Sequence, residues 1–212
     1  MQRKLDKFYK YKQPSFYRFN EDSIRLVNFV TNELQALHPG KKIVVYDAFC
    51  GCGVIGIEFY IRNKGVVSKT IFIEENMKFD TFIEENLSLY AGESKVLIKD
   101  FFECTKESLT ISEKDVLNVV LINPPYFLPN LKREPLDADR RNARFFKTEN
   151  DFFRINKKIV SLFSRSNFKS YCLFREDMIS PQGLINKLNK EKISISIHKF
   201  DDSKISIFSL EN

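Results

Sequence analysis

Short apolar runs alternate with segments of helical periodicity along most of this 212-residue chain. Apolar runs of four to seven residues bounded by turns predict buried strands, and apolar residues three or four positions apart predict amphipathic helices. The predicted strands are 43–46, 70–73, 95–98, 116–122 and 171–174. The predicted helices are 21–37, a stretch that follows Gly53 and ends near Asn63, 76–90, 151–163 and 181–189. This alternation predicts a parallel sheet covered by helices on both faces.

The end of the chain departs from this alternation. Ile193–Phe200 and Ile205–Leu210 are two strand-like runs separated by Asp201-Asp202-Ser203-Lys204, a combination that predicts a hairpin. We therefore expect an α/β fold with a Rossmann-like, seven-stranded, doubly wound sheet that is mainly parallel and has an antiparallel C-terminal hairpin. Residues 21–212 are predicted to form a single domain, preceded by a basic segment over residues 1–20.

Basic residues outnumber acidic ones and give the chain a formal net charge of +6. They gather in residues 1–20 and in a second cluster further along the chain. The second cluster consists of Lys132, Arg133, Arg140, Arg141, Arg144 and Lys147. Basic surfaces attract polyanions by releasing counterions, so nucleic acid is the favoured partner, although a solvated surface explains the charge equally well.

The sequence also bears on where the protein works. It contains no run of 18 apolar residues and no signal peptide, so we expect a cytoplasmic protein that does not enter a membrane. We take it to be a monomer. The cysteines lack the spacing of a zinc site and are expected to be free thiols in a reducing compartment. They are Cys50, Cys52, Cys104 and Cys172.

Polar residues stand at the ends of the first four predicted strands. They are Asp47, Glu74, Asp100 and Asn123. Because ligands of open parallel sheets bind outside the carboxyl ends of the strands, these four side chains predict one binding site.

A glycine-rich turn follows the first strand. Gly51 and Gly53 allow a sharp turn close to a ligand, and Gly56 allows the next helix to pack on the sheet. A strand, a glycine turn and a helix indicate a nucleotide-type ligand, either NAD or S-adenosylmethionine. The carboxylate of Asp47 favours the second, because it would repel a pyrophosphate and attract the methionyl ammonium group.

The next two strand ends suit the rest of such a ligand. Glu74, or its neighbour Glu75, is placed to accept hydrogen bonds from ribose hydroxyls. Asp100 can accept the adenine amino group, and the ring of Phe101 can flank the base. Each of these residues taken alone could also be ordinary surface or core.

Asn123-Pro124-Pro125-Tyr126 follows the fourth strand and carries the reaction chemistry. The carbonyl oxygen of Pro124 and the amide oxygen of Asn123 offer two acceptors to one –NH2 group. Two accepted hydrogen bonds can localise a nitrogen lone pair that is otherwise delocalised into a π system. Tyr126 offers a ring on which a planar group stacks. The tetrapeptide therefore predicts methylation of a planar amino group.

These residues resemble the class I S-adenosylmethionine-dependent methyltransferases, in particular the amino-methylating branch marked by (Asn/Asp)-Pro-Pro-(Tyr/Phe). The resemblance covers about residues 20–210. It implies that Asp47, Gly51 and Gly53 hold the methionyl part, Glu74 the ribose and Asp100 the adenine. Phe49, Phe101 and Asn123 complete the implied cofactor set, and Asn123, Pro124, Pro125 and Tyr126 position the acceptor. No metal is implied, because the sulfonium is already activated and transfer depends on positioning.

Two further stretches are similar to bacterial enzymes that N6-methylate adenosine-37 of a valine tRNA. The first is Tyr11–Ser23, which contains the sequences Gln-Pro and Tyr-Arg-Phe. The second is Arg140-Arg141-Asn142-Ala143-Arg144. The resemblance implies that Arg18 and Phe19 belong to a lid and that Arg140, Arg141 and Arg144 contact tRNA phosphates. Phe145-Phe146 stand where that family usually has His-Glu, and Ala48-Phe49-Cys50 is more similar to ribosomal-RNA guanine-N2 methyltransferases.

We expect adenine-N6 methylation of tRNA or another structured RNA. The alternatives are N5-methylation of a release-factor glutamine, guanine-N2 methylation of ribosomal RNA, and an inactive module of this fold that binds RNA or protein. DNA methylation is disfavoured, because the chain has no room for a domain that reads a duplex and flips a base.

Overall fold

A computed structural model describes residues 11–88, 90, 92–111, 115–129, 133–148, 150–188, 193–200 and 204–212. Some residues named above lie outside these ranges. They are residues 1–10 of the basic N-terminal segment, residues 89 and 189 of two predicted helices, Lys132 of the second basic cluster, and 201–203 between the last two strands.

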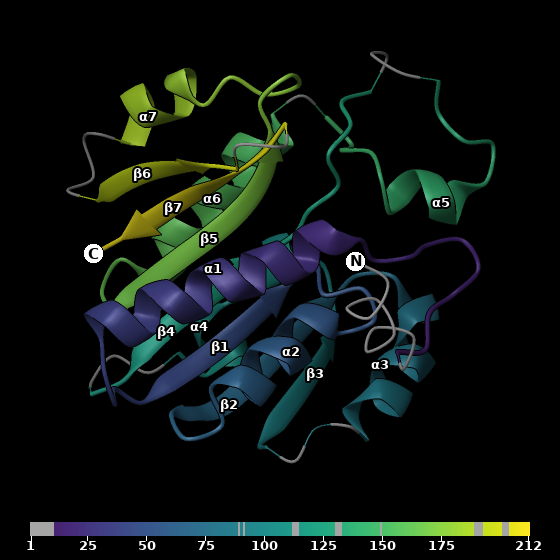
Figure 1. The fold of residues 1–212 in the computed structure, drawn as a ribbon. Helices are drawn as coiled ribbons and strands as arrows, with labels where there is room; N and C mark the ends of the chain where they lie inside the picture. The colour runs from purple at the N-terminus through teal and green to yellow at the C-terminus, as the bar shows by residue number, and fades with distance from the viewer. Residues whose placement is uncertain are drawn as a thin grey trace.

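Seven strands form one sheet, as the sequence predicts (Figure 1). They are β1 (Ile43–Ala48), β2 (Val67–Glu74), β3 (Ser94–Ile98), β4 (Leu117–Ile122), β5 (Phe168–Arg175), β6 (Ser194–Lys199) and β7 (Ile205–Glu211). Their order is β3-β2-β1-β4-β5-β7-β6, and β1 to β5 pair in parallel. β1 lies between β2 and β4, where the strand order reverses.

The C-terminal hairpin is confirmed, with β7 inserted between β5 and β6. β7 pairs antiparallel with both neighbours, so β6 runs in the same direction as β1 to β5. Successive side chains of β7 are buried on opposite faces of the sheet. The core therefore extends beyond the parallel strands on both faces. β6 is the edge strand and is half-exposed along its length.

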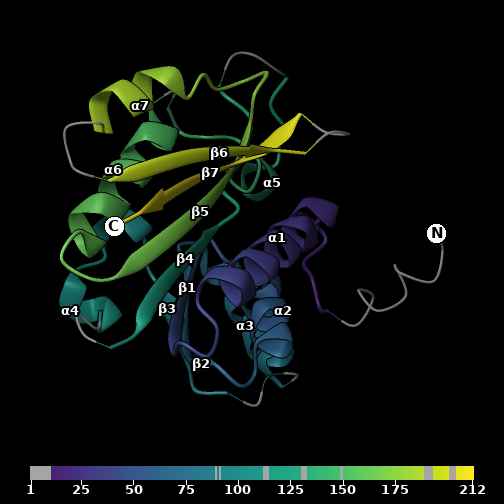
Figure 2. The ribbon, with the colours of Figure 1, turned by 60° about the vertical axis from the view of Figure 1, so that its left-hand side comes forward.

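Helices cover both faces of the sheet (Figures 1 and 2). One face carries α1 (Glu21–Leu37), α2 (Val54–Arg62) and α3 (Asp80–Leu87), the last preceded by a 3-10 turn over Met77–Phe79. The other carries α4 (Lys106–Leu109) and α6 (Asp151–Phe163). Two further helices are α5 (Ala138–Asn142) and α7 (Gln182–Leu188), and a 3-10 turn spans Phe101–Glu103.

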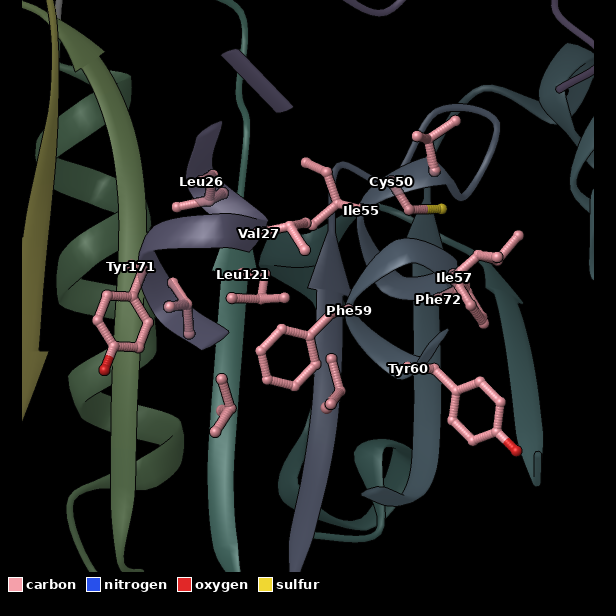
Figure 3. Close-up of a cluster of buried hydrophobic side chains, with 14 of the residues drawn as sticks. Leu26, Val27, Cys50, Ile55, Ile57, Phe59, Tyr60, Phe72, Leu121 and Tyr171 are labelled. Carbon is pink, nitrogen blue, oxygen red and sulfur yellow. The ribbon is translucent and has the colours of Figure 1, made fainter. Parts of the chain in front are cut away.

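The strands divide the hydrophobic core into two layers, because successive side chains point to opposite faces. On the α1–α2 face, Leu26 and Val27 of α1 and Phe59 of α2 pack over Leu121 of β4 and Tyr171 of β5 (Figure 3). On the opposite face, the rings of Tyr46 and Phe163 lie 4.9 Å apart. Burial on both faces explains why β1 and β4 read as continuous apolar runs.

Helix α1 has the predicted bounds, and no side chain caps its N-terminus. Asn20 occupies the position before the first helical residue, yet its side chain accepts no hydrogen bond from the helix. Its amide instead donates to the carboxylate of Asp22 at 2.6 Å. Packing of the buried face of α1, rather than capping, therefore holds this helix in place.

Candidate active site

The turn after β1 lies at the carboxyl end of the sheet and has an unusual backbone. Phe49, Gly51 and Gly53 have φ values of 59°, 54° and 80°. The left-handed region costs glycine little, which explains the two glycines, whereas Phe49 adopts it as a side-chain-bearing residue. Asp47 supports the turn from below, because its Oδ2 accepts the backbone N–H of Gly56 at 2.7 Å.

Asp47 is completely buried, and its second oxygen, Oδ1, has no hydrogen-bond partner among the described residues. Burial raises the pKa of this carboxyl to about 7, the Gly56 N–H opposes the rise, and the charge of Glu74 adds to it. The structure thus places Asp47 and Gly53 behind the turn, where they shape it without lining a cavity.

A first cavity, of about 370 Å³, opens over this turn and is called here the glycine-loop cavity. It brings together five of the predicted cofactor residues. Those five are Phe49, Gly51, Glu74, Asp100 and Asn123. Glu75, Asp139 and Asp151 also line it, against one lysine, Lys147, so its wall is predominantly acidic.

Glu74 is tied to the backbone around it. Its Oε2 accepts the N–H of Gly51 and its Oε1 accepts that of Asn76, both at 2.9 Å. Burial raises its pKa, and the two backbone N–H groups oppose that rise. Glu75 is exposed and pairs with Lys147 at 2.8 Å. Both acids line the cavity, so the choice between them as ribose ligand stays a prediction, with Glu74 the more rigidly placed.

The two phenylalanines after β3 face opposite ways. The Asp100 carboxylate accepts the N–H of Phe102 at 2.8 Å and starts the 3-10 turn. This turn directs Phe101 into the core, where it is 2% exposed and packs against Phe49 with a centroid separation of 5.6 Å. Phe102 lines the glycine-loop cavity instead. The ring that lines the cavity is therefore that of Phe102, one position after the predicted Phe101.

A second cavity, of about 690 Å³, adjoins the first and is called here the arginine cavity. Four arginines line it: Arg18, Arg140, Arg144 and Arg175. All four residues of the tetrapeptide 123–126 line it as well. Asn123 and Pro125 line both cavities, as do Tyr17 and Ala143, so these residues form the wall between them.

The side chain of Asn123 is held at both ends. Its Nδ2 donates to Ser23 Oγ at 2.9 Å, and its Oδ1 accepts a short hydrogen bond from the hydroxyl of Tyr126. Burial raises the pKa of Tyr126 well above its ordinary value, so its hydroxyl remains a donor. The amide oxygen that we predict to accept the substrate amine thus faces Tyr126 in this structure.

The segment after the tetrapeptide folds back onto it. The carbonyl oxygen of Arg144 accepts the N–H of Tyr126 at 3.2 Å and that of Phe127 at 3.0 Å, and Phe146 N–H donates to the Phe127 carbonyl at 2.8 Å. Phe145 and Phe146 are buried and line the glycine-loop cavity. Because two phenylalanines stand where the similar family has His-Glu, this part of the cavity wall is apolar.

The predicted RNA-contacting residues separate into two groups. Arg18, Arg140 and Arg144 are exposed and line the arginine cavity. Arg141 lines neither cavity and approaches Glu134 at 3.9 Å. Phe19 lines neither cavity and packs edge-on against Tyr11 at 5.9 Å. Tyr17, two positions before Phe19, lines both cavities, and its N–H donates to the Pro14 carbonyl at 3.3 Å. A lid role for Arg18 and Phe19 stays a prediction.

Arg175 was missed by the sequence reasoning. It ends β5 and forms a bidentate pair with Asp177 at 3.0 and 2.9 Å. Arg144 and Arg175 each lie 5.5 Å from the centroid of the Phe127 ring. The sequence contained a signal for it. Polar residues at the carboxyl ends of parallel strands are expected to face a ligand, and Arg175 follows the apolar run of the fifth strand.

Comparison with known sequences identifies the family. Residues 7–142, more than half of the chain, match the family described as conserved hypothetical protein 95. The chain belongs to the conserved hypothetical protein 95 family. The matched region of this family member includes the glycine turn, the ends of β1 to β4 and the tetrapeptide 123–126. No curated protein sequence matched the chain.

Solved structures share the fold. A Pyrococcus horikoshii protein, described as a candidate RNA methyltransferase, is 17% identical over 100% of this chain and 99% of its own, with a TM-score of 0.57. A Streptococcus thermophilus rRNA methylase is 11% identical over 92% of this chain and 99% of its own, with a TM-score of 0.53. The hMettl16 catalytic domain, in complex with a MAT2A 3′UTR hairpin, is 12% identical over 94% of this chain and 73% of its own, with a TM-score of 0.63. The family member therefore has the fold of class I methyltransferases.

No group of three or more His, Cys, Asp or Glu among the described residues could hold a metal ion. None of the described helices is long and apolar enough to cross a membrane. All four cysteines are buried free thiols, as predicted.

Proposed function

We propose that this protein is an S-adenosylmethionine-dependent methyltransferase that methylates an exocyclic amino group of RNA, namely adenine N6 in tRNA. The observation that carries the proposal is the position of Asn123-Pro124-Pro125-Tyr126 at the end of β4. Asn123 and Pro125 line both the acidic glycine-loop cavity and the arginine cavity. A methyl donor and an anionic acceptor would meet at this wall.

The glycine-loop cavity suits S-adenosylmethionine. Its acidic lining favours a cationic ligand, and Glu74 and Asp100 offer carboxylate oxygens to hydroxyl and amino groups. The rings of Phe49 and Phe102 offer apolar surface to a flat base. Bound there, S-adenosylmethionine supplies a methyl group already activated by a sulfonium. The protein's own contribution is to hold donor and acceptor in line.

The tetrapeptide supplies the acceptor side of the reaction. Asn123 Oδ1 and the Pro124 carbonyl accept hydrogen bonds from the two N–H groups of the amine, which directs the nitrogen lone pair toward the donor. When the methyl group bonds to this nitrogen, S-adenosylhomocysteine would be the leaving group and one N–H proton would pass to water. The carbonyl oxygen of an amide has two lone pairs, so Asn123 can receive an amine beside or in place of the Tyr126 hydroxyl. Tyr126 then stacks on the planar acceptor.

The arginine cavity favours RNA over a protein acceptor. Arg18, the neighbouring Arg140 and Arg144, and Arg175 come from three separate parts of the chain and line one cavity. Arg175 is paired with Asp177, so Arg18, Arg140 and Arg144 are the proposed phosphate contacts. Guanidinium groups bind phosphate oxygens through paired hydrogen bonds, whereas a glutamine side chain would need no such cluster. Guanine-N2 methylation of ribosomal RNA is the second candidate, because the first motif is more similar to that group. The monomeric state and cytoplasmic location stay predictions.

Transfer of labelled methyl from S-adenosylmethionine to total tRNA tests the proposal. We expect incorporation with the purified protein and a loss of at least about a hundredfold with Asn123→Ala, because the acceptor would lose its orienting hydrogen bond. Cofactor binding, measured by calorimetry, checks that the variant is folded. Label on protein alone would favour the glutamine acceptor, and no label with intact cofactor binding would favour an inactive binding module.

A further inference from the structure

Asn123 is held by Ser23, the last residue of the Tyr11–Ser23 stretch, to which the resemblance assigns no role. Ser23 lies 100 positions earlier in the sequence, in the first turn of α1, and its Oγ accepts a hydrogen bond from Asn123 Nδ2 at 2.9 Å. Ser23 is 2% exposed and lines neither cavity. It therefore contacts the amide without reaching any bound substrate.

The contact matters because the amide group must be held still if it is to orient an amine. Both neighbours of the Asn123 amide are hydroxyl groups, which can donate as well as accept, so they fix the position of the amide group. In the observed orientation Tyr126 donates its hydroxyl proton to Oδ1. A substrate amine that binds at Oδ1 competes with this hydroxyl. Ser23 then remains as the described partner on the Nδ2 side.

Helix α1 gives Ser23 a fixed position. The residues just beyond it, Leu26, Val27 and Val30, are completely buried against the sheet. Figure 1 shows α1 lying across the face of the sheet, with its first turn toward the carboxyl ends of the strands. The hydroxyl of Ser23 is therefore held by a helix that packs on the core and not by a loop.

We propose that Ser23 is a positioning residue that holds the Asn123 amide group in place for the acceptor amine. The inference rests on the proposed function for its effect on methyl transfer, but the contact between Ser23 and the amide can be measured separately. It assigns to α1 a role in the reaction beyond packing.

The chain contains a matched control on the same helix. Thr31 is also buried, at 7% exposed, and its Oγ1 also accepts a hydrogen bond from an asparagine, Asn63 Nδ2, at 3.0 Å. It lines neither cavity. Ser23→Ala and Thr31→Val each remove one buried hydroxyl from α1. A difference in activity between the two variants therefore reflects the contact of Ser23 with Asn123 and not the loss of a buried hydrogen bond in general.

We expect Ser23→Ala to lower kcat about tenfold, the effect of losing one orienting hydrogen bond, and to leave the KM for S-adenosylmethionine and the affinity for RNA within about twofold of the unaltered protein. Thr31→Val should leave kcat unchanged. Ser23→Thr, which keeps the hydroxyl, should recover most of the activity. Equal losses in Ser23→Ala and Thr31→Val, matched by equal losses of thermal stability, would overturn the inference.

A spectroscopic measurement separates this inference from the proposed function. The side-chain amide resonances of Asn123, assigned by their absence in Asn123→Ala, should exchange with solvent several times faster in Ser23→Ala than in the unaltered protein or in Thr31→Val. Unchanged exchange would overturn the positioning role whatever the activity. Faster exchange in a protein that methylates no RNA would instead overturn the proposed function and leave the Ser23 contact established.

Discussion

The carboxyl group of Asp47 makes the pH dependence of folding predictable at the scale of one residue. Burial raises its pKa to about 7, so the folded state holds the proton more tightly than the unfolded chain does. The stabilisation from this proton is complete below about pH 4 and is lost as the pH rises to about 7. A charged Asp47 with a free Oδ1 is thus a source of instability near neutral pH.

We predict that the free energy of unfolding attributable to Asp47 falls by about 2 kcal/mol between pH 5 and pH 8. Asp47→Asn removes the titrating group and should flatten the curve. Urea unfolding of both proteins at several pH values measures the difference, with Glu74 present in each as a common background. Parallel curves for the two proteins would show that Asp47 does not titrate in this range.

Which aromatic ring faces the site was beyond sequence reasoning. Phe101 and Phe102 are neighbours of the same type, and the hydrogen bond from the Phe102 N–H to Asp100 decides which of them turns inward. Tyr17 and Phe19 are likewise separated by the conformation of an irregular segment. Asn123, Glu74 and Asp100 were predictable because they follow strands whose ends a parallel sheet must align.

At the scale of elements, the junction of β1 and α2 depends on Gly56. A Cβ atom there would lie 2.5 Å from a ring carbon of Phe72 and 3.1 Å from Asp47 Oδ2. The role predicted for this glycine, close packing of helix on sheet, is confirmed. The same closeness makes the Gly56 N–H to Asp47 hydrogen bond possible.

We predict that Gly56→Ala destabilises the protein by about 1–3 kcal/mol, because Phe72 is completely buried and has little room to move. Gly65→Ala is the matched control, since a Cβ at Gly65 would meet nothing within 4 Å. Thermal unfolding of the two variants gives the comparison. A loss for Gly56→Ala no larger than that for Gly65→Ala would contradict the packing argument.

The segment after β4 is where the prediction of elements fell short. No helix or strand was predicted between 122 and 151. The structure contains α5 there, begun by the Asp137 carboxylate, which accepts the N–H of Arg140 at 2.7 Å. Five residues without a buried face give no apolar periodicity. Contacts from distant parts of the chain hold it, including the 2.6 Å pair between Lys78 and Asp139.

At the scale of the whole molecule, the sheet was predictable and the arginine cavity was not. Each strand and each long helix is encoded by its own periodicity, so the order of elements could be inferred from local patterns. The cavity instead gathers Arg18, the local pair Arg140 and Arg144, and Arg175 from three segments far apart in sequence. Only the folded arrangement brings these charges together.

We predict that changing Arg18, Arg140 and Arg144 together to glutamine weakens RNA binding and lowers the slope of log affinity against log salt by about 2, the number of counterions no longer released. Cofactor affinity should not change. The control variant changes Lys64, Lys157 and Arg165, which are exposed and line neither cavity. Both triple variants are compared in a filter-binding titration over a range of salt. Equal effects would mean that RNA binding depends on the net charge of the protein and not on the arginines of this cavity.

The most direct measurement is nucleoside mass spectrometry of total tRNA incubated with the protein and S-adenosylmethionine carrying a heavy methyl group. The account predicts one new heavy nucleoside, N6-methyladenosine, which is absent when Asn123→Ala replaces the unaltered protein. Heavy N2-methylguanosine would preserve amine methylation and contradict the adenine acceptor. The central claim fails if no RNA nucleoside gains the heavy methyl group while the protein binds the cofactor.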